Sequence, residues 1–267
     1  MSKNLSYCGQ VVRDHDPDRF LLSMFAPADR REALWALFAF NHEIAKTRES
    51  VTETQLGLIR LQWWRDGVAS IYEGEAVPEH VALLALAEAI KAYDLPQEHF
   101  NALIYAREFD LEDVRPSTME GVLHYADFTT TPLLKLAVQI CGDDPEAEPV
   151  TPIAVNYALA GLLRAAAAHA AQRRCYLPED LMNEGGLMLN KLYDFKPQEG
   201  LLKVVEAVAG EFVGDVKSDT AFLKASQALA RIYICQIKGL GFDIFHAKMR
   251  VEPAFKAFRL LVSVRFV

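Results

Sequence analysis

The residues with the chemistry of a binding or catalytic site lie on two stretches that the sequence predicts to be long helices. In the first, residues 32–49, an aromatic and apolar half is followed by a polar half. In the second, residues 156–180, Arg164 lies on one helical strip and Ala165 and His169 on the next, because residues four positions apart share a face. Two polar strips on otherwise apolar helices indicate a bound partner. The polar half of the first stretch comprises His42, Glu43, Lys46, Arg48 and Glu49.

The second stretch is expected to be the central helix of the fold. It is an unbroken run of strong helix formers that ends at the turn signal of Pro178. Its small residues leave almost no side chain, so neighbouring helices can approach its backbone closely and the helix should be buried. Those small residues are Ala160, Gly161, Ala166, Ala167, Ala170 and Ala171.

Both stretches are part of a longer pattern. The second contains LLRxxxxxxxxRRxYLPxD, and upstream stand RREALWALFAFNHEI and GLIRLQWWRDGVASIY. From Phe20 to about Phe245 this pattern resembles the squalene/phytoene synthase family of head-to-head prenyltransferases. The resemblance implies an all-α, isoprenoid-synthase-type helical bundle around a central cavity, formed by residues 1–267 as a single domain.

In active members of this family, each of the two helices bears an Asp-x-x-x-Asp motif that holds Mg²⁺ ions against a diphosphate. The matching positions here run from Ala45 to Glu49 and from Ala165 to His169, and Lys46 stands where a further acid is common. The Asn that precedes the second motif corresponds to Gly161, and the phosphate-facing Arg before the first corresponds to His42. The resemblance therefore implies vestigial motif positions, with no catalytic residue and no metal ligand: Ala45, Lys46, Glu49, Ala165 and His169.

The chemical consequence of these replacements is large. Mg²⁺ takes hard oxygen ligands in near-octahedral order, usually carboxylates together with phosphate oxygens. One carboxylate, Glu49, opposite an alanine and an imidazole does not supply them. Losing the metals removes a Lewis acid that is worth several kcal/mol for each ion. We therefore expect no cofactor, and Mg²⁺ only if the chain is an enzyme after all.

The first functional hypothesis is a pseudoenzyme. The segments YCGQVVRDHDPDRFLLSMFAP, AFNHEIAKTRESV and GFDIFHAKM resemble a non-catalytic branch of the family, whose mitochondrial members assist the assembly of respiratory complex I. This branch implies chaperone-like binding of a complex I subunit by a helical scaffold. A prenyl lipid in the central cavity is a second candidate ligand.

The alternative is a surviving prenyltransferase, or a binder of prenyl diphosphates or lipids. Arg164, Arg173, Arg174 and Tyr176 still match the family, and with His42 they form a candidate phosphate-binding pocket. Arg can bind a phosphate without a metal. Arg173 and Arg174 are equally suited to capping the end of the helix, where cations interact favourably with its dipole. For His169, a hydrogen-bonded place in the core is the commoner role than that of a ligand or base.

Composition limits the partners. The 267 residues carry a formal net charge of −8 with no basic run, which argues against nucleic-acid binding. The four cysteines have no ligand spacing and suit a reducing compartment. We find no signal peptide and no apolar stretch that approaches a transmembrane span, so we expect a cytoplasmic protein, soluble or peripheral to the inner membrane and not secreted.

Local signals predict several helix boundaries. Thr52 with Gln55 and Ser117 with Glu120 are capping-box patterns, and Asp29 is a candidate N-cap. The run Thr129–Thr131 is expected to end a helix, with Pro132 starting a fresh one. The final helix, residues 254–267, mixes basic and apolar residues, and a closing core helix is favoured over a membrane-surface helix.

Overall fold

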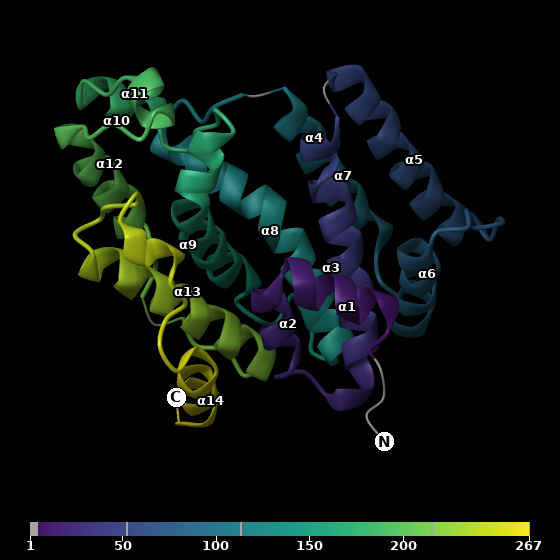
Figure 1. The fold of residues 1–267 in the computed structure, drawn as a ribbon. Helices are drawn as coiled ribbons and strands as arrows, with labels where there is room; N and C mark the ends of the chain where they lie inside the picture. The colour runs from purple at the N-terminus through teal and green to yellow at the C-terminus, as the bar shows by residue number, and fades with distance from the viewer. Residues whose placement is uncertain (1–4, 52, 113, 215, 267) are drawn as a thin grey trace. The chain divides into compact units, whose positions relative to one another are not determined.

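The computed structural model describes residues 5–51, 53–112, 114–214 and 216–266, and every regular element in them is a helix (Figure 1). The expected all-α class is therefore confirmed. The chain forms two compact units. Unit 1 comprises residues 1–112, 132–150 and 219–222, and unit 2 comprises residues 113–131, 151–218 and 223–267.

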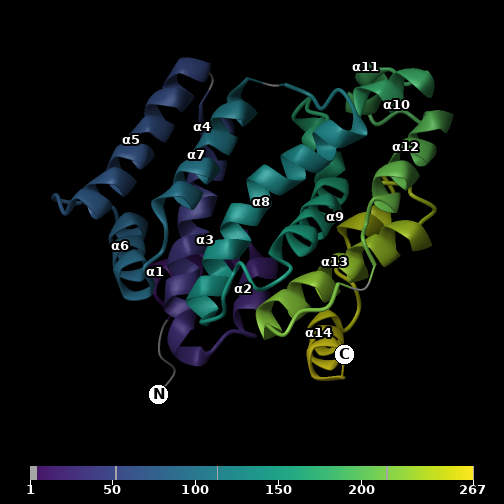
Figure 2. The same ribbon diagram turned by 180° about the vertical axis from the view of Figure 1, so that it is seen from behind.

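Unit 1 contains the N-terminal helices, coloured purple to blue in Figures 1 and 2. They are α1 (Tyr7–His15), α2 (Pro17–Ser23), the 3₁₀ turn η1 (Ala28–Arg30), α3 (Arg31–Ala45), α4 (Thr47–Ser50), α5 (Thr54–Glu73), α6 (Val81–Tyr93) and α7 (Gln97–Leu111). Helix α3 forms the centre of this unit, because its apolar half is buried on every side. The Phe40 ring meets Trp64 and Phe100 edge to face, each at 5.6 Å between centroids.

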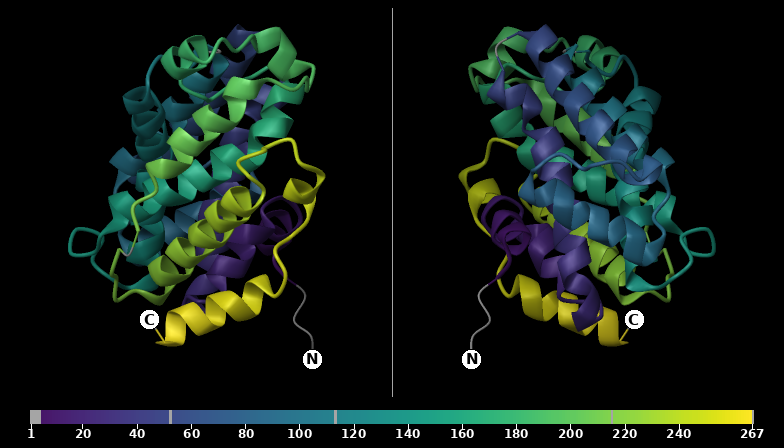
Figure 3. Two further views of the ribbon diagram at one scale, coloured as in Figure 1. Left: turned by 90° about the vertical axis from the view of Figure 1, so that its left-hand side faces the viewer. Right: turned by 90° about the vertical axis from the view of Figure 1, so that its right-hand side faces the viewer.

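Unit 2 contains most of the helices coloured green to yellow (Figure 3). They are α9 (Val150–Ala171), α10 (Glu179–Glu184), α11 (Leu189–Tyr193), α12 (Glu199–Gly210), α13 (Ala221–Gly239), the 3₁₀ turn η2 (Ala247–Arg250) and α14 (Lys256–Phe266). The fully buried Asn156 on α9 joins three of its segments. Its amide donates to the Val213 carbonyl at 2.8 Å and to the Gln227 side chain at 3.0 Å, and it accepts from the Val213 N–H at 2.9 Å.

Helix α8 (Met119–Cys141) is continuous, so the expected break at Pro132 is wrong. Proline removes one backbone hydrogen bond, but the helix continues where other groups make up for it. The Thr129 hydroxyl donates to the Tyr125 carbonyl at 2.6 Å, one turn back, and Thr131 bonds the Asp127 carboxylate at 2.5 Å. The hydroxyls that suggested a cap therefore bond within the helix. The division between the two units falls at Pro132.

The other predicted caps differ in detail. Thr118, and not Ser117, accepts from the Gly121 N–H at 3.2 Å at the start of α8. Asp29 lies inside η1, and no side chain caps α3. Thr52, the first residue of the other capping box, lies outside the described residues.

Helix α9 departs from the predicted central helix in two ways. It ends at Ala171, well before Pro178. It is also only partly buried, since Ala160 and Ala170 are in the core whereas a side chain added at Gly161 would meet nothing within 4 Å. By length and composition α9 could cross a membrane, against the expectation that no stretch would, although core helices of soluble proteins meet the same criterion.

The last helix, α14, was expected to close the core. Among the described side chains of α14, only Leu260 follows that expectation, with no exposed surface. The apolar residues on the opposite face are exposed, because no other helix covers them in the described part of the chain: Phe258, Leu261 and Val262.

Candidate functional site

The first motif position lies at the junction of two helices. α3 ends at Ala45 and α4 begins at Thr47, so Ala45 and Glu49 belong to different helices, joined by Lys46. Glu43 on the last turn of α3 is buried, and its carboxylate meets Lys46 Nζ at 2.5 Å and Arg60 Nη2 at 3.3 Å. Lys46 therefore neutralises the carboxylate one turn before it.

His42 stacks against another histidine. The rings of His42 and His15 are parallel within 13° and their centroids are 4.6 Å apart. Burial lowers the pKa of His42, and the charges of His15 and Lys46 lower it further, against the opposing effects of Glu43 and Asp16. The neutral imidazole is thus the favoured form, which makes His42 a weak counterpart to a phosphate.

The second motif position lies in unit 2, on α9. The His169 ring meets the Tyr176 ring edge to face at 4.8 Å, and Tyr176 in turn lies 4.9 Å from Tyr125. His169, Arg174 and Tyr176 line a cavity of about 20 Å³, which is room for about one water molecule. The remaining lining is apolar apart from Cys175: Val122, Leu162, Leu163, Ala166, Leu177, Leu192, Val208 and Ile244.

The backbone of Arg173 and Arg174 closes α9. The Arg174 N–H donates to the His169 carbonyl at 2.8 Å and the Arg173 N–H to the Ala170 carbonyl at 2.9 Å. This is the hydrogen-bond pattern of a Schellman motif, and Arg173 has the left-handed backbone that the motif needs, with φ of 57°. These capping hydrogen bonds come from backbone amides, and the interaction of the two side-chain charges with the helix dipole stays a prediction. The Arg173 guanidinium lies over the Tyr193 ring, 5.6 Å from its centroid.

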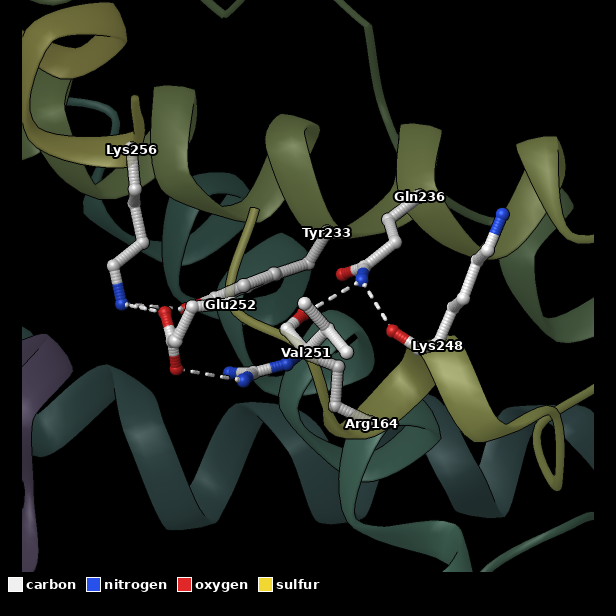
Figure 4. Close-up of polar contacts among 7 residues, drawn as sticks. All are labelled: Arg164, Tyr233, Gln236, Lys248, Val251, Glu252 and Lys256. Carbon is white, nitrogen blue, oxygen red and sulfur yellow. Dashed lines mark hydrogen bonds and ion pairs between the residues drawn. The ribbon is translucent and has the colours of Figure 1, made fainter. Parts of the chain in front are cut away.

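Arg164 is held in a separate network (Figure 4). Its guanidinium carbon is 3.6 Å from the centroid of the Tyr233 ring, and its Nη2 is 3.6 Å from a Glu252 oxygen. Lys256 pairs with the same carboxylate and lies 3.3 Å from the Tyr233 hydroxyl. The residues before α14 are fixed as well, since Gln236 donates to two of their carbonyls at 3.0 Å each.

Sequence reasoning missed Tyr233 and Glu252 as partners of Arg164. Both lie far along the chain, and only the Glu252–Lys256 pair has the four-residue spacing that a sequence reveals. The sequence therefore indicates that Arg164 has an interaction partner, but it does not identify that partner.

The comparisons with known proteins agree with this architecture. The squalene/phytoene synthase family profile matches residues 12–248, which is most of the chain. The chain belongs to the squalene/phytoene synthase family. The described residues contain no group of three or more His, Cys, Asp or Glu placed to hold a metal ion.

Relatives of this chain include mammalian proteins named "NADH dehydrogenase (ubiquinone) complex I, assembly factor 6". The Bos taurus protein is 28% identical and the Homo sapiens protein 27% identical, each over 91% of this chain and 77% of the relative. The presqualene diphosphate synthase of Rhodopseudomonas palustris is 27% identical over 60% of this chain and 58% of its own length.

Solved structures of family enzymes share the isoprenoid synthase fold. A dehydrosqualene synthase, crystallised with a ligand, superposes with a TM-score of 0.77 at 16% identity and covers 97% of this chain and 94% of that one. Squalene synthase HpnC from Alicyclobacillus acidocaldarius gives 0.73 at 20% identity, with 88% and 93% covered. The expected isoprenoid-synthase fold is therefore confirmed.

The structure groups the predicted site residues into separate sets. Within unit 2, His169, Arg174 and Tyr176 share one cavity, whereas Arg164 and Arg173 stack on different tyrosines. Ala165 lies on α9, between them in sequence. The first-motif residues belong to unit 1, where Lys46 pairs with a neighbouring carboxylate and Glu49 is exposed on α4: His42, Ala45, Lys46 and Glu49.

Proposed function

We propose that this chain is a family member without Mg²⁺–diphosphate chemistry, which acts as an assembly or chaperone-like factor for respiratory complex I. The observation that carries the first part is the set of donors at the two motif positions. Ala45 and Ala165 offer no ligand atom, Glu49 offers one carboxylate and His169 one imidazole. Mg²⁺ bound to a diphosphate takes oxygen ligands, and this set provides too few of them.

The state of the cations supports the same proposal. Lys46 is paired with the buried Glu43, and Arg164 is stacked on Tyr233 and paired with Glu252. A diphosphate would have to displace these internal partners. Its binding free energy is therefore reduced by the free energy of the interactions that it breaks. His42, with its lowered pKa, adds no positive charge at neutral pH.

Support for the assembly role comes from the extent of the similarity. The two assembly-factor relatives align over 91% of the chain, whereas the presqualene diphosphate synthase aligns over 60% at a similar identity. The role implies a protein partner, a complex I subunit, and a location in the cytoplasm or at the surface of the inner membrane. It requires no turnover.

Activity is tested by mixing the purified chain with farnesyl or geranylgeranyl diphosphate and Mg²⁺ and measuring diphosphate release. We expect none above the no-protein blank, with an active family enzyme as the positive control. The matched variant restores the acids (Ala45→Asp, Glu49→Asp, Ala165→Asp, His169→Asp), and Mg²⁺ binding that appears only in this variant would support the lost-ligand explanation. Mg²⁺-dependent product from the unmodified chain would refute it.

The assembly role is tested in the source organism by deleting the gene and measuring assembled complex I on native gels. We expect less assembled complex, restored equally by the unmodified chain and by Glu49→Gln. Unchanged assembly in the deletion strain would contradict the role. A metal-independent affinity for prenyl diphosphate that Arg164→Ala abolishes would favour the lipid-binding alternative instead.

A further inference from the structure

The face of α14 that points away from the core is apolar. Phe255, immediately before the helix, is 81% exposed and Phe258 is 64% exposed. Leu261 and Val262 continue the same exposed face, because they follow Phe258 by three and four residues. Large apolar side chains grouped in this way mark an interaction surface more often than isolated ones do.

The segment before α14 is held firmly, so this face has a defined direction. Glu252 pairs with Arg164 of α9 and with Lys256, and Gln236 of α13 binds the carbonyls of Lys248 and Val251 (Figure 4). In Figure 3, α14 follows this connector as the last yellow helix of unit 2. We call residues 247–266 the C-terminal surface.

The charge of this part of the chain is opposite to that of the rest. Residues 223–267 contain eight Lys and Arg residues against two Asp and Glu residues, which gives a formal charge of +6. The whole chain contains 28 Lys and Arg residues against 36 Asp and Glu residues, which gives a net charge of −8. A basic segment in an acidic chain indicates an anionic partner. Four of the cations are exposed on the C-terminal surface itself: Lys248, Arg250, Arg259 and Arg265.

We propose that the C-terminal surface docks on an anionic lipid bilayer. Phe255, Phe258, Leu261 and Val262 enter the boundary between headgroups and acyl chains, and the exposed cations meet lipid phosphates. An amphipathic helix with an apolar face and flanking basic residues binds membranes in this way. A second copy is a poorer fit, because residues 247–266 carry five Lys and Arg against one Glu, and two faces of formal charge +4 would repel each other. Four large apolar side chains in the centre of the surface suit lipid better than nucleic acid.

This inference is independent of the proposed assembly role, because vesicle binding needs neither complex I nor substrate. The full chain is sedimented with vesicles of phosphatidylcholine, or of phosphatidylcholine and phosphatidylglycerol in equal parts. We expect binding to the anionic vesicles, at least about tenfold weaker binding to the neutral ones, and weakening by salt.

Two pairs of substitutions assign the binding to the C-terminal surface. Phe255→Ser with Phe258→Ser should weaken binding by at least about tenfold. Arg259→Gln with Arg265→Gln should weaken it by about fivefold for each cation removed. Circular dichroism and thermal melting verify that each variant is folded, and the arginine pair decides the question if the phenylalanine pair fails to fold.

Matched controls lie elsewhere on the surface. Tyr105→Ser removes an aromatic side chain that is 61% exposed on α7, and Lys91→Gln with Lys203→Gln removes two exposed cations. Both should leave vesicle binding unchanged. The proposal is wrong if the phenylalanine pair binds like the unmodified chain or if the controls lose binding equally. It is also wrong if these phenylalanines mediate a dimer, or the cations bind DNA, without any vesicle binding.

Discussion

The Arg164 guanidinium carbon lies 3.6 Å from the centroid of the Tyr233 ring, which is the spacing of a close stack. The Arg164 side chain is 24% exposed, so the interaction is partly desolvated and stronger than one in open water. The stack joins α9 to α13. The ion pair with Glu252 extends it to the segment before α14, although that carboxylate is 57% exposed.

A double-mutant cycle measures this stack. We expect Arg164→Ala and Tyr233→Leu to be coupled by about 1–2 kcal/mol in the free energy of unfolding, because each alone removes the same cation–π contact. Arg164 and Glu252 should be coupled by no more than about 1 kcal/mol, since exposed ion pairs contribute little. Urea unfolding followed by circular dichroism gives both values. Equal coupling to the two partners would show that the stack is not the main interaction.

The end of α9 gives a second prediction. Arg173 has the left-handed backbone, which costs a residue with a side chain roughly 1–2 kcal/mol and glycine much less. Arg173→Ala loses the contact with Tyr193 and keeps the strain, whereas Arg173→Gly loses the contact and relieves the strain. We expect the glycine variant to be about 1 kcal/mol more stable than the alanine variant.

The control for this prediction is Ala171→Gly, two residues earlier. Residue 171 is the last residue of α9, where glycine lowers stability by roughly 0.5–1 kcal/mol. Thermal melting of the three variants at one pH is sufficient. If Arg173→Gly is no more stable than Arg173→Ala, the left-handed geometry of Arg173 is not present in solution.

His42 contributes to the pH dependence of the free energy of unfolding. Its pKa in the folded chain lies below the ordinary value of 6.5, chiefly because of burial. Protonation therefore favours unfolding, so the stability from this site is complete above pH 6.5 and is lost as the pH falls through the lowered pKa. We expect His42→Asn to reduce the drop in melting temperature between neutral and mildly acidic pH.

A histidine NMR titration gives an independent measure of the same effect. The pKa of His42 should lie below 6.5 and should rise in His15→Asn, because the charge of the stacked His15 ring contributes to the lowering. It should stay below 6.5 even then, since burial is the larger cause. A normal His42 pKa in the unmodified chain would contradict the stacked and partly buried position of this ring.

Local sequence signals predicted the individual helices, because helix formers run unbroken and glycine and proline mark most boundaries, whereas the all-α class followed from the family resemblance. It failed where a boundary lacked its usual residue. Arg173 takes the left-handed position that glycine normally signals, and Pro132 lies inside a continuous helix where a break was expected. In both cases the residue type gave a misleading signal of where the helix ends.

The candidate site was predictable in part for a similar reason. The motif positions follow from the order of residues, but the partner of Arg164 lies on another helix. The sequence also did not determine which face of α14 packs against the core. Leu260 and Phe258 are both apolar, and only the fold decides which of them is covered. A pattern with apolar residues on two faces does not say which face meets the core.

The last prediction concerns the buried amide that joins α9, α13 and the segment after α12. Asn156 makes three hydrogen bonds, to the Val213 carbonyl and N–H and to Gln227. Asn156→Ala removes all three hydrogen bonds, although the Val213 carbonyl keeps the Gln227 amide as a donor at 3.3 Å and Val213 is 53% exposed, so we expect a loss of about 1–3 kcal/mol in the free energy of unfolding. Asn190→Ala, at an exposed position on α11, should change stability by less than about 0.5 kcal/mol. Urea unfolding of both variants measures the two losses in the free energy of unfolding. Similar small losses in both would mean that water replaces the amide of Asn156.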